Sequence, residues 1–486
     1  MASGALSTGI DDRRGRKQRL KSLADQLATV RAQWCERAAF FHAEDLRYMR
    51  FLVPPGSRVL ELGCGIGDLL AALEPSYGVG IDFSERMVEQ ARGRHPGLEF
   101  VVGDVEDGAC IASLSGPFDF IIYSDTVGSL EDLQGTLELV HSQCERHTRV
   151  IIAYYAYFWD PLLKLAERCG RKMPTHAQNA LSTDAIVALM HLADLDMVKR
   201  EWRQLLPVDL WGIGQWINRY IATLPGIRRL ALRNYVVGRS LRRGGVPPSS
   251  ASVIVPCRNE RGNIEPAVTR LPKFCADIEI IFVEGHSQDG TYEEALRVRA
   301  AYPECDIKVL RQDGVGKADA VFKGFAHARG EVLLILDADL TTPPEQLTKF
   351  WEALAAGKAE YAHGTRLTYP MEREAMRFLN LLANWGFSIL FSWLLNQRIT
   401  DTLCGTKVLR KTDYLRLRAG HGYFGDFDPF GDFDLIFGAA KLSLKTVEIP
   451  IRYAARQYGK TQISRFRHGW LLVKMVVFAY RKLKAI

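Results

Sequence analysis

The sequence predicts an α/β protein with two domains, each built around a mostly parallel sheet. Short apolar runs of strand length alternate with helical stretches in two separate series. Several of these runs end in glycine or in a carboxylate, as strands do where open α/β sheets bind ligands. The chain has 486 residues, which exceeds the usual size of one domain.

The two series define the predicted domain boundaries. The first domain is predicted at 20–238, with strands Val59–Leu62, Val79–Ile81, Phe100–Val102, Phe118–Tyr123 and Val150–Tyr155. The second is predicted at 251–486, with strands Val253–Val255, Ile278–Val283, Ile307–Leu310, Val332–Leu336 and Tyr361–His363. Residues 239–250, RSLRRGGVPPSS, are rich in Gly, Pro, Ser and Arg, which favours a surface linker.

The composition is that of an ordinary folded protein. Hydrophobic residues make up 47% and charged residues 24%, which excludes the disordered class. Nine scattered cysteines without a C-x-x-C pair argue against structural zinc and favour free thiols in a reducing compartment. The charged N-terminal segment predicts no signal peptide. The net charge of +7 is mild, and we expect no nucleic-acid partner.

A glycine-rich loop follows the first predicted strand. Residues 61–67 read ELGCGIG, and glycines there let the backbone turn tightly and approach a ligand. Asp82 ends the second strand about 20 residues later, where an acidic residue can bind a ribose diol. Asp104 ends the third strand. The candidate cofactor-binding residues are Glu61, Gly63, Gly65, Gly67, Asp82, Asp104 and Val105.

This combination resembles class I S-adenosylmethionine-dependent methyltransferases over roughly residues 40–205. Glu61 matches that family's acidic residue ahead of the loop, unlike the G-x-G-x-x-G of dinucleotide binders. The resemblance implies a Rossmann-like fold with S-adenosyl-L-methionine as cofactor. It places Glu61 near the methionine moiety, Asp82 on the ribose hydroxyls and Asp104 near the adenine amine. The alternative is a cofactor-binding scaffold without catalysis.

The residues after the fourth strand do not point to one methyl acceptor. They read SDTVGSLEDL, not the Asn-Pro-Pro-Tyr type of enzymes that methylate amino groups in nucleic acids. His141, His147 and His176 are candidate bases, but each is more simply interpreted as a surface or core histidine. The aromatic stretch Leu205–Gly238 is predicted either to cover the cofactor or to bridge to the second domain.

The most informative segment of the second domain is 331–345, EVLLILDADLTTPPE. Its apolar run is typical of a buried strand and ends in Asp337-Ala338-Asp339. Carboxylates at that point project from the carboxyl edge of a sheet. Carboxylate oxygens suit Mg²⁺ or Mn²⁺ held together with substrate phosphates, so Asp337 and Asp339 are the candidate metal ligands.

Three further loops follow neighbouring predicted strands. They read PCRNE at 256–260, VEGHSQDGT at 283–291 and Gly316-Lys317. The whole set resembles inverting family-two glycosyltransferases of the GT-A fold, from Ala251 to about Ser464. The resemblance implies a nucleotide-sugar bound by Pro256, Asn259, Glu260, Glu284, Asp289, Lys317, Asp337 and Arg366. The family commonly has two acidic residues where this chain has Glu284-Gly285. Without the second acid the base cannot be assigned, so a UDP-hexose and a GDP-hexose both stay candidate donors.

Later motifs narrow the resemblance to the branch that includes dolichyl-phosphate mannose and glucose synthases. They are RITDTLCGTK at 398–407, FGDFD at 430–434 and RQYGKT at 456–461. In that branch the acceptor is a polyprenyl phosphate. The implied catalytic residues are Asp337, Asp339, Asp432, Asp434 and Arg456. For the last three, a surface salt bridge is the alternative.

The acceptor decides whether a general base is needed. A sugar hydroxyl must lose a proton to attack, whereas a phosphate monoester, with a second pKa of about 6, is already largely ionised. The sequence has several arginines near the predicted site and no obvious activated histidine. This favours a polyprenyl phosphate as the acceptor. The alternative is a hydroxyl on a glycan or protein, with Asp432 or Asp434 as base. The first domain would then methylate that glycan or serve as a scaffold.

Two C-terminal helices, predicted at 372–397 and 469–484, are candidates for contact with an anionic membrane surface. Phe378–Gln397 has a polar residue at every fourth position, so it is predicted to lie in the interface or against the core, not to span. Trp470–Tyr480, with an aromatic residue at each end, suits either the bilayer–water interface or a helix packed on the protein. No acidic residue follows Glu448, so the C-terminal sequence is basic. We therefore predict a cytoplasmic protein, peripheral on the inner face of the cell membrane.

Overall fold

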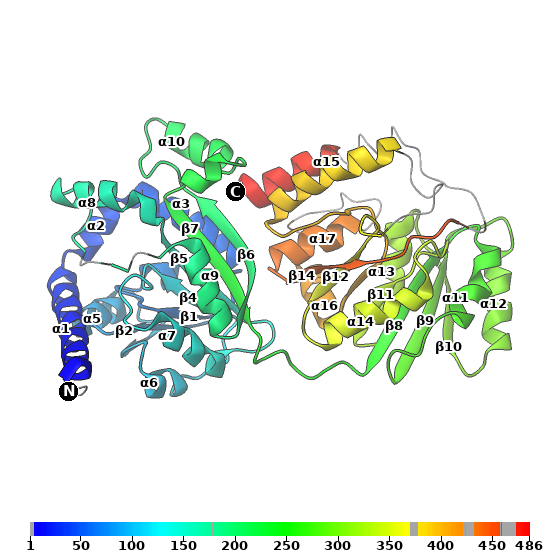
Figure 1. The fold of residues 1–486 in the computed structure, drawn as a ribbon, viewed down its shortest axis with the longest axis horizontal. Helices are drawn as coiled ribbons and strands as arrows, with labels where there is room; N and C mark the ends of the chain where they lie inside the picture. The colour runs from blue at the N-terminus through cyan, green and yellow to red at the C-terminus, as the bar shows by residue number, and fades with distance from the viewer. Residues whose placement is uncertain are drawn as a thin grey trace. The chain divides into compact units, whose positions relative to one another are not determined.

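The computed structural model describes residues 4–175, 178–179, 181–369, 378–420, 423, 432–456, 458 and 473–486, without the side chains of 4–14, 378–384 and 432. The chain divides into two compact units, Met1–Gly245 with Lys484–Ile486, and Val246–Leu483 (Figure 1). Strands extend to Ser240 and resume at Ser250, so the connection is shorter than the predicted linker at 239–250. All nine cysteines are free thiols.

The sheet of the first unit has seven strands in the order β3-β2-β1-β4-β5-β7-β6. They are β1 (Arg58–Leu62), β2 (Tyr77–Asp82), β3 (Glu99–Val102), β4 (Phe120–Ser124), β5 (Arg149–Tyr155), β6 (Leu195–Arg203) and β7 (Arg233–Ser240). The first five are parallel, and β7 runs antiparallel to both of its neighbours. Parallel strands are covered on both faces, which explains their nearly continuous apolar sequences.

The helices of the first unit are α1 (Gly4–Leu27), α2 (Arg31–Arg37), α3 (Ala39–Leu52), α4 (Asp68–Ala72), α5 (Glu85–Arg94), α6 (Gly108–Ala112), α7 (Leu133–Leu139), α8 (Asp160–Arg168), α9 (Thr183–Leu192) and α10 (Ile213–Trp216). Helices α6, α7 and α9 lie side by side (Figure 1), while α4 and α5 pack against β2. Side-chain caps from Ser84, Asp132 and Ser182 begin α5, α7 and α9.

The sheet of the second unit also has seven strands, in the order β10-β9-β8-β11-β13-β12-β14. They are β8 (Ser250–Cys257), β9 (Asp277–Glu284), β10 (Asp306–Arg311), β11 (Val332–Ile335), β12 (Tyr361–Thr365), β13 (Lys407–Arg410) and β14 (Thr446–Pro450). Strand β13 is antiparallel to β11 and β12. The ten predicted strands are all present in the two sheets, whereas β6, β7, β13 and β14 were not predicted.

The helices of the second unit are α11 (Ile264–Thr269), α12 (Thr291–Ala301), α13 (Lys317–His327), α14 (Leu347–Ala355), α15 (Phe378–Leu395), α16 (Lys411–Ala419) and α17 (Asp432–Lys441), followed by a helix at 473–479. Helix α13 packs against β8 and β9, and α14 packs against β12 and β13. A core between the sheet and α11, α12 and α14 includes Val253, Phe282, Leu334 and Phe350.

Helix α15 has one face in the core and one exposed apolar face. The ring centroid of Phe391 lies 5.4 Å from that of Phe433, and Ser388 is buried on the same side. Trp385 is 61% exposed and Ile389 is 52% exposed. No helix in the described part of the chain is both long and apolar enough to cross a bilayer. The remainder of the two predicted helices, 372–377 and 469–472, lies outside the described residues.

Candidate active sites

Three glycines with left-handed backbone shape the loop after β1. Gly63, Gly65 and Gly67 have φ angles of 82°, 53° and 77°. A Cβ on Gly63 would lie 2.3 Å from Thr126, and one on Gly67 would lie 2.6 Å from Phe100. A Cβ on Gly65 would meet no atom within 4 Å. The loop therefore packs tightly at both ends and leaves its middle open, where a ligand can approach the backbone.

Two buried carboxylates flank this loop. Asp82 Oδ2 accepts a hydrogen bond from the Gly65 backbone nitrogen and Oδ1 accepts one from Ser84, both at 2.9 Å. Glu61 is 3% exposed, and its Oε2 has no hydrogen-bond partner within the described residues. Burial raises the pKa of Asp82 and raises the pKa of Glu61 to about 8. A buried oxygen without a partner is costly, and a cationic ligand with N–H donors would satisfy it.

Helix α1 contacts the same edge of the sheet beyond β3. Lys17 forms an ion pair with Asp104, and Asp25 accepts a hydrogen bond from Ser84 at 2.6 Å. Val105 is buried next to Asp104. These contacts could not be predicted, because no motif in the sequence of α1 indicates which strand end it contacts.

A buried arginine at the start of β7 joins residues that sequence reasoning missed. The Nε of Arg233 donates to Asp45 at 2.9 Å, and its guanidinium also forms an ion pair with Asp125. Burial alone would lower the pKa of Arg233, but the two carboxylates hold it well above its usual range. Asp125 follows β4, which pairs with β1, so this cluster lies at the carboxyl edge beside the glycine loop.

The candidate histidines that the structure describes, His141 and His147, make local structural contacts. His141 is buried between Ser240 and the Ala193 carbonyl oxygen, and His147 contacts Asp119 at 2.9 Å. His176 lies outside the described residues. His42 was not predicted; burial, with the charge of Arg31, lowers its pKa, so its ring is neutral at pH 7.

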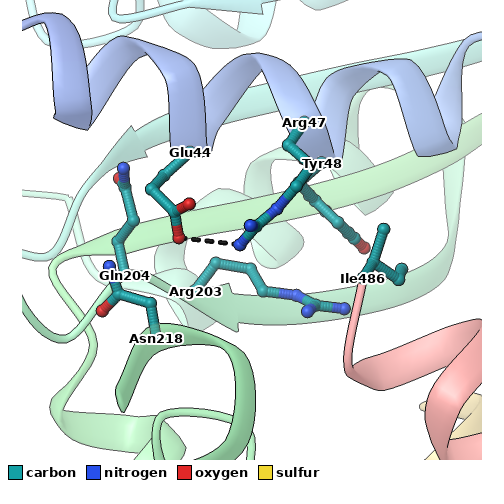
Figure 2. A pocket seen from close by; sticks show the side chains of 7 residues that line it. All are labelled: Glu44, Arg47, Tyr48, Arg203, Gln204, Asn218 and Ile486. Atoms are coloured by element: carbon teal, nitrogen blue, oxygen red, sulfur yellow. Dashed lines mark hydrogen bonds and ion pairs between the residues drawn. The ribbon is translucent and has the colours of Figure 1, made fainter. Parts of the chain in front are cut away.

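Figure 2 shows a small cavity elsewhere in the first unit. Its volume is about 10 Å³, and the side chains around it are Glu44, Arg47, Tyr48, Arg203, Gln204, Asn218 and Ile486. Glu44 and Arg47 form an ion pair of 2.8 Å there. This space holds about one water molecule, so it cannot take a cofactor.

In the second unit, Asp337 and Asp339 follow β11 and each contacts a cation. Asp337 Oδ1 lies 2.6 Å from the Lys317 Nζ, and Asp339 Oδ2 accepts a hydrogen bond of 2.7 Å from Arg456. Burial opposes ionisation of Asp337, but the charge of Lys317 lowers its pKa, so the carboxylate is ionised at pH 7. A Cβ on Gly405 would lie 1.9 Å from Asp337 Oδ2. Glycine at 405 therefore makes room for this carboxylate.

Arg456 connects the β11 edge to the loop after β8. Its second nitrogen donates to Glu260 at 2.7 Å, and Asn263 donates to the other oxygen of Glu260 at 2.6 Å. Burial raises the pKa of Glu260 despite the positive charge of Arg456. One arginine thus holds two carboxylates from different strand ends.

The loops after β8 and β9 are joined by hydrogen bonds. The Asn259 side chain accepts one from the Gln288 backbone at 2.9 Å, and Glu284 accepts one from the Ser287 backbone. Asp289 accepts one of 3.2 Å from the Arg261 backbone. Pro256 is part of β8 itself. These predicted donor-site residues therefore come together at one edge of the sheet.

Arg366 and the two acidic residues of α17 are placed differently. Arg366 pairs with the buried carboxylate of Asp401 at 2.6 and 2.8 Å, a partner that the sequence did not indicate. Lys407, fully buried, donates to the Cys404 carbonyl oxygen at 2.7 Å. Asp434 is 8% exposed on α17, and the side chain of Asp432 is outside the described residues.

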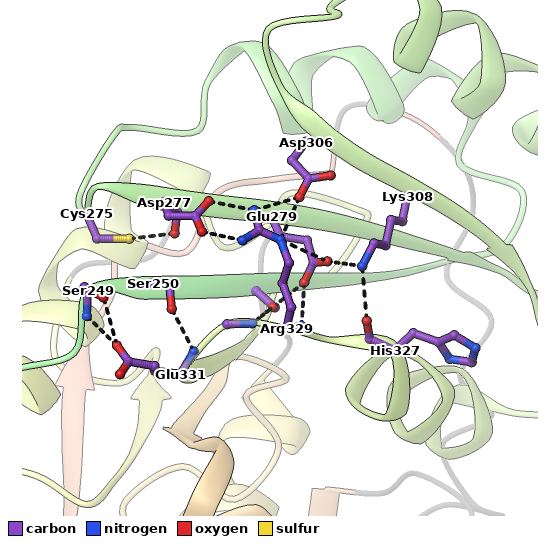
Figure 3. A network of polar contacts seen from close by, with 12 residues as sticks. Ser249, Ser250, Cys275, Asp277, Glu279, Asp306, Lys308, His327, Arg329 and Glu331 are labelled. Atoms are coloured by element: carbon purple, nitrogen blue, oxygen red, sulfur yellow. Dashed lines mark hydrogen bonds and ion pairs between the residues drawn. The ribbon is translucent and has the colours of Figure 1, made fainter.

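A second charged cluster of this unit lies at the opposite, amino edge of the sheet (Figure 3). Arg329 donates to Asp277 at 2.7 Å and to Asp306 at 2.9 Å, at the starts of β9 and β10. Glu279 accepts a hydrogen bond of 3.0 Å from the Arg329 backbone and pairs with Lys308. Every acid here has a protein partner, which identifies a structural network.

The aspartates after β11 fit a cation that also binds substrate oxygens. No group of three or more His, Cys, Asp or Glu side chains in the described chain is arranged to hold a metal. Asp337 and Asp339 would supply two oxygen ligands. The remaining coordination positions of the cation would be left to a diphosphate and water, as is usual for Mg²⁺.

Two family models match the chain. Glycosyl transferase family 2 matches residues 252–416, and a methyltransferase domain matches residues 30–200. A dolichol-phosphate mannosyltransferase of Pyrococcus furiosus is 32% identical over 46% of the chain and 63% of its own length. The one from Saccharomyces cerevisiae is 40% identical over 21% of the chain and 40% of its own length. The chain thus spans less than two thirds of each of these relatives.

A solved methyltransferase from Thermotoga maritima, described as a possible histamine N-methyltransferase, is 18% identical to the chain. It matches 45% of the chain and 99% of its own length with a TM-score of 0.35.

Proposed function

We propose that this chain, which combines a methyltransferase domain with a family 2 glycosyltransferase domain, is a bifunctional enzyme. The second unit, 251–486, moves a hexose from a UDP- or GDP-sugar to a polyprenyl phosphate, with inversion at the sugar. The first, 20–238, binds S-adenosyl-L-methionine and transfers its methyl group. The observation that carries the sugar transfer is the pair Asp337 and Asp339, each against a basic side chain at one sheet edge.

The charges at this edge suit a departing nucleoside diphosphate. Negative charge develops on that group as the sugar leaves, and Mg²⁺ or Mn²⁺ held by Asp337 and Asp339 would neutralise it. Lys317 and Arg456 already contact these carboxylates, so both cations stand where phosphate oxygens would bind. Glu260, Glu284 and Asp289, on the adjoining loops, would accept hydrogen bonds from the base and ribose.

A phosphate acceptor matches the residues present. It needs alignment and charge neutralisation more than a base, because its second pKa is about 6. The two relatives named above are dolichol-phosphate mannosyltransferases. The exposed apolar face of α15 and the basic, acid-free sequence after Glu448 would meet a lipid acceptor at an anionic cytoplasmic membrane surface.

The test is a mass-spectrometric screen of nucleotide-sugars with dolichyl or undecaprenyl phosphate, with Mn²⁺ or with EDTA. Faster transfer to a soluble glycan than to the lipid phosphate would favour the alternative, a hydroxyl acceptor with Asp432 or Asp434 as base. Activity would then fall steeply at low pH as that base is protonated.

The first unit's proposed cofactor fits the open loop and the unsatisfied acid. S-adenosyl-L-methionine carries a sulfonium and an amino group, and Glu61 Oε2 is a buried acceptor without a partner. Asp82 and Asp104 would meet the ribose and adenine. Calorimetry on the parent and on Gly65→Arg tests binding, because that side chain would fill the open position. Labelled cofactor that binds but never yields a methylated product would favour the scaffold alternative.

A further inference from the structure

The exposed apolar side chains of the first unit concentrate on two segments, 157–165 and 208–230, which we call the apolar lobe. They include Tyr157, Phe158, Leu162, Val208, Trp211 and Trp216, each more than half exposed except Phe158 at 50%. Elsewhere in the described part of this unit, exposed large hydrophobic residues are scattered singly: Val102, Leu192 and Leu241. A concentrated apolar patch on a folded surface indicates an interaction site.

The two segments form one ordered surface. The indole nitrogen of Trp159 donates to the Leu230 carbonyl oxygen at 3.0 Å, and the Ala156 backbone donates to Leu232 at 2.8 Å. Asn218 is 3% exposed, accepts from the Leu206 backbone at 2.9 Å and donates to its carbonyl at 2.8 Å. The exposure therefore belongs to a folded surface with its own internal hydrogen bonds.

Trp211 is the most unusual residue of the lobe. It is 98% exposed and has a φ of 52°, a left-handed backbone that bulky side chains rarely adopt. A fully exposed side chain gains nothing from packing that would offset this conformation. Backbone strain beneath a side chain that does not pack against the fold is a reason to look for a function of that side chain.

The charges of both segments identify the partner. The second segment, 208–230, carries three basic residues against one acidic residue, and the first segment taken together with the seven residues that follow it, 157–172, carries four against two. Trp and Tyr favour the boundary between lipid and water, and basic residues are attracted to anionic head groups. We propose that the apolar lobe docks on an anionic lipid bilayer, with Trp211 and Trp216 inserted at the interface. The methyltransferase unit thereby has its own membrane contact, whatever sugar or acceptor the second unit uses.

The test is flotation of the full chain with vesicles of phosphatidylglycerol and phosphatidylcholine in equal amounts. Trp211→Asn is the informative variant, because asparagine tolerates a left-handed backbone and so keeps or improves folding. Combined with Trp216→Ala, it should weaken vesicle binding by about tenfold or more, since two large apolar side chains no longer leave water. Leu192→Asn, at a residue 64% exposed outside the lobe, is the matched control and should leave binding unchanged.

Binding by the parent should also fall with added salt and with removal of phosphatidylglycerol. Binding of the double variant equal to that of the parent would overturn the proposal. So would loss of binding only in Trp385→Gln on α15, since the contact would then belong to the second unit. Suppose ultracentrifugation shows that the parent is a dimer and the double variant a monomer. In that case a second copy of the chain covers the lobe, and the bilayer proposal is wrong. Sugar-transfer rates on a soluble substrate, measured in parallel, keep this result separate from the proposed activity.

Discussion

In the first unit, the two carboxylates that flank the glycine loop are buried without a basic partner, although Asp104 and Asp125 at the same edge pair with Lys17 and Arg233. Glu61 and Asp82 form no ion pair with a described residue, and burial raises the pKa of both. In the second unit, Asp337 and Asp339 each contact a cation, and Lys317 lowers the pKa of Asp337 against its burial. The two pairs of acids, at similar strand ends, are therefore in opposite electrostatic states.

This difference matches the charge of the ligand that each unit is proposed to bind. A sulfonium cofactor brings its own positive charge, so basic side chains beside Glu61 would repel it. A nucleotide-sugar brings a diphosphate, which needs cations from the protein as well as from a metal. At these two pairs of acids, a basic partner is absent in the first unit and present in the second, which suits ligands of opposite charge.

Asp339→Asn should have the largest effect, because it removes a carboxylate from the proposed metal pair. We expect sugar transfer to fall by about 10²–10³-fold, or about 3–4 kcal/mol of transition-state stabilisation. Initial rates with Mn²⁺ and with EDTA measure it. Asp313→Asn, at a side chain 83% exposed, should be neutral. A parent enzyme that keeps its full rate in EDTA would falsify the metal assignment.

Gly405→Ala tests the space around Asp337. The new Cβ would lie 1.9 Å from the Asp337 carboxylate and 2.5 Å from the Lys317 Nζ, so both groups must move. Displacement of a reacting group by about 1 Å can cost about 10²-fold in rate, and we expect a loss of that order in sugar transfer. Gly386→Ala, where the Cβ meets nothing within 4 Å, is the control. An unchanged rate in Gly405→Ala would show that Asp337 need not hold its place.

The core of each fold could be predicted from sequence because its strands are continuous apolar runs followed by glycine or carboxylates. The edge strands β6 and β14 and the antiparallel strands β7 and β13 could not. Strand β6 reads LDMVKREWR, and β14, TVEIP, is only half-buried, so neither has the apolar sequence of a central strand. These strands are specified by pairing with distant partners.

The site residues follow the same rule. Asp82, Asp104, Asp337 and Asp339 could be singled out because each follows a strand within a short motif. The partners that set their charge could not, since Arg233 reaches Asp45 across 188 residues of sequence. Lys17 and Arg456 similarly come from segments without a local signal for their contacts. Sequence therefore indicates which acids lie at the edge, while the structure shows which of them are neutralised.

Glu61→Gln tests the unpaired acid of the first unit through stability. The pKa of Glu61, about 8 in the folded protein, exceeds its ordinary 4.5, so the folded chain retains a proton that the unfolded chain releases. Stability is therefore lost as pH rises from 4.5 towards 8. Glutamine removes this loss, so the variant should be more stable than the parent at pH 8 by up to about 4 kcal/mol and similar at pH 4.

Thermal unfolding at the two pH values measures this effect, with the exposed Glu89→Gln as control. The same variant should bind S-adenosyl-L-methionine more weakly and lose the rise in affinity with pH that ionisation of Glu61 gives the parent. A gain in stability together with a loss of cofactor binding in Glu61→Gln would then both trace to the Glu61 carboxylate. Equal stability of variant and parent at pH 8 would show that Glu61 is not held neutral by burial.

Arg329→Gln should have the smallest effect and tests the contrast between the two edges of the second sheet. The Arg329 side chain is 45% exposed, so solvent screens its ion pairs with Asp277 and Asp306 (Figure 3). We expect a loss of about 1 kcal/mol in unfolding free energy, reduced further by salt, and an unchanged rate of sugar transfer. Chemical unfolding of the variant beside Arg299→Gln, an exposed arginine of α12, measures it. Loss of transfer in Arg329→Gln without loss of stability would mean that the amino edge takes part in function, against the proposal that places sugar transfer at the carboxyl edge.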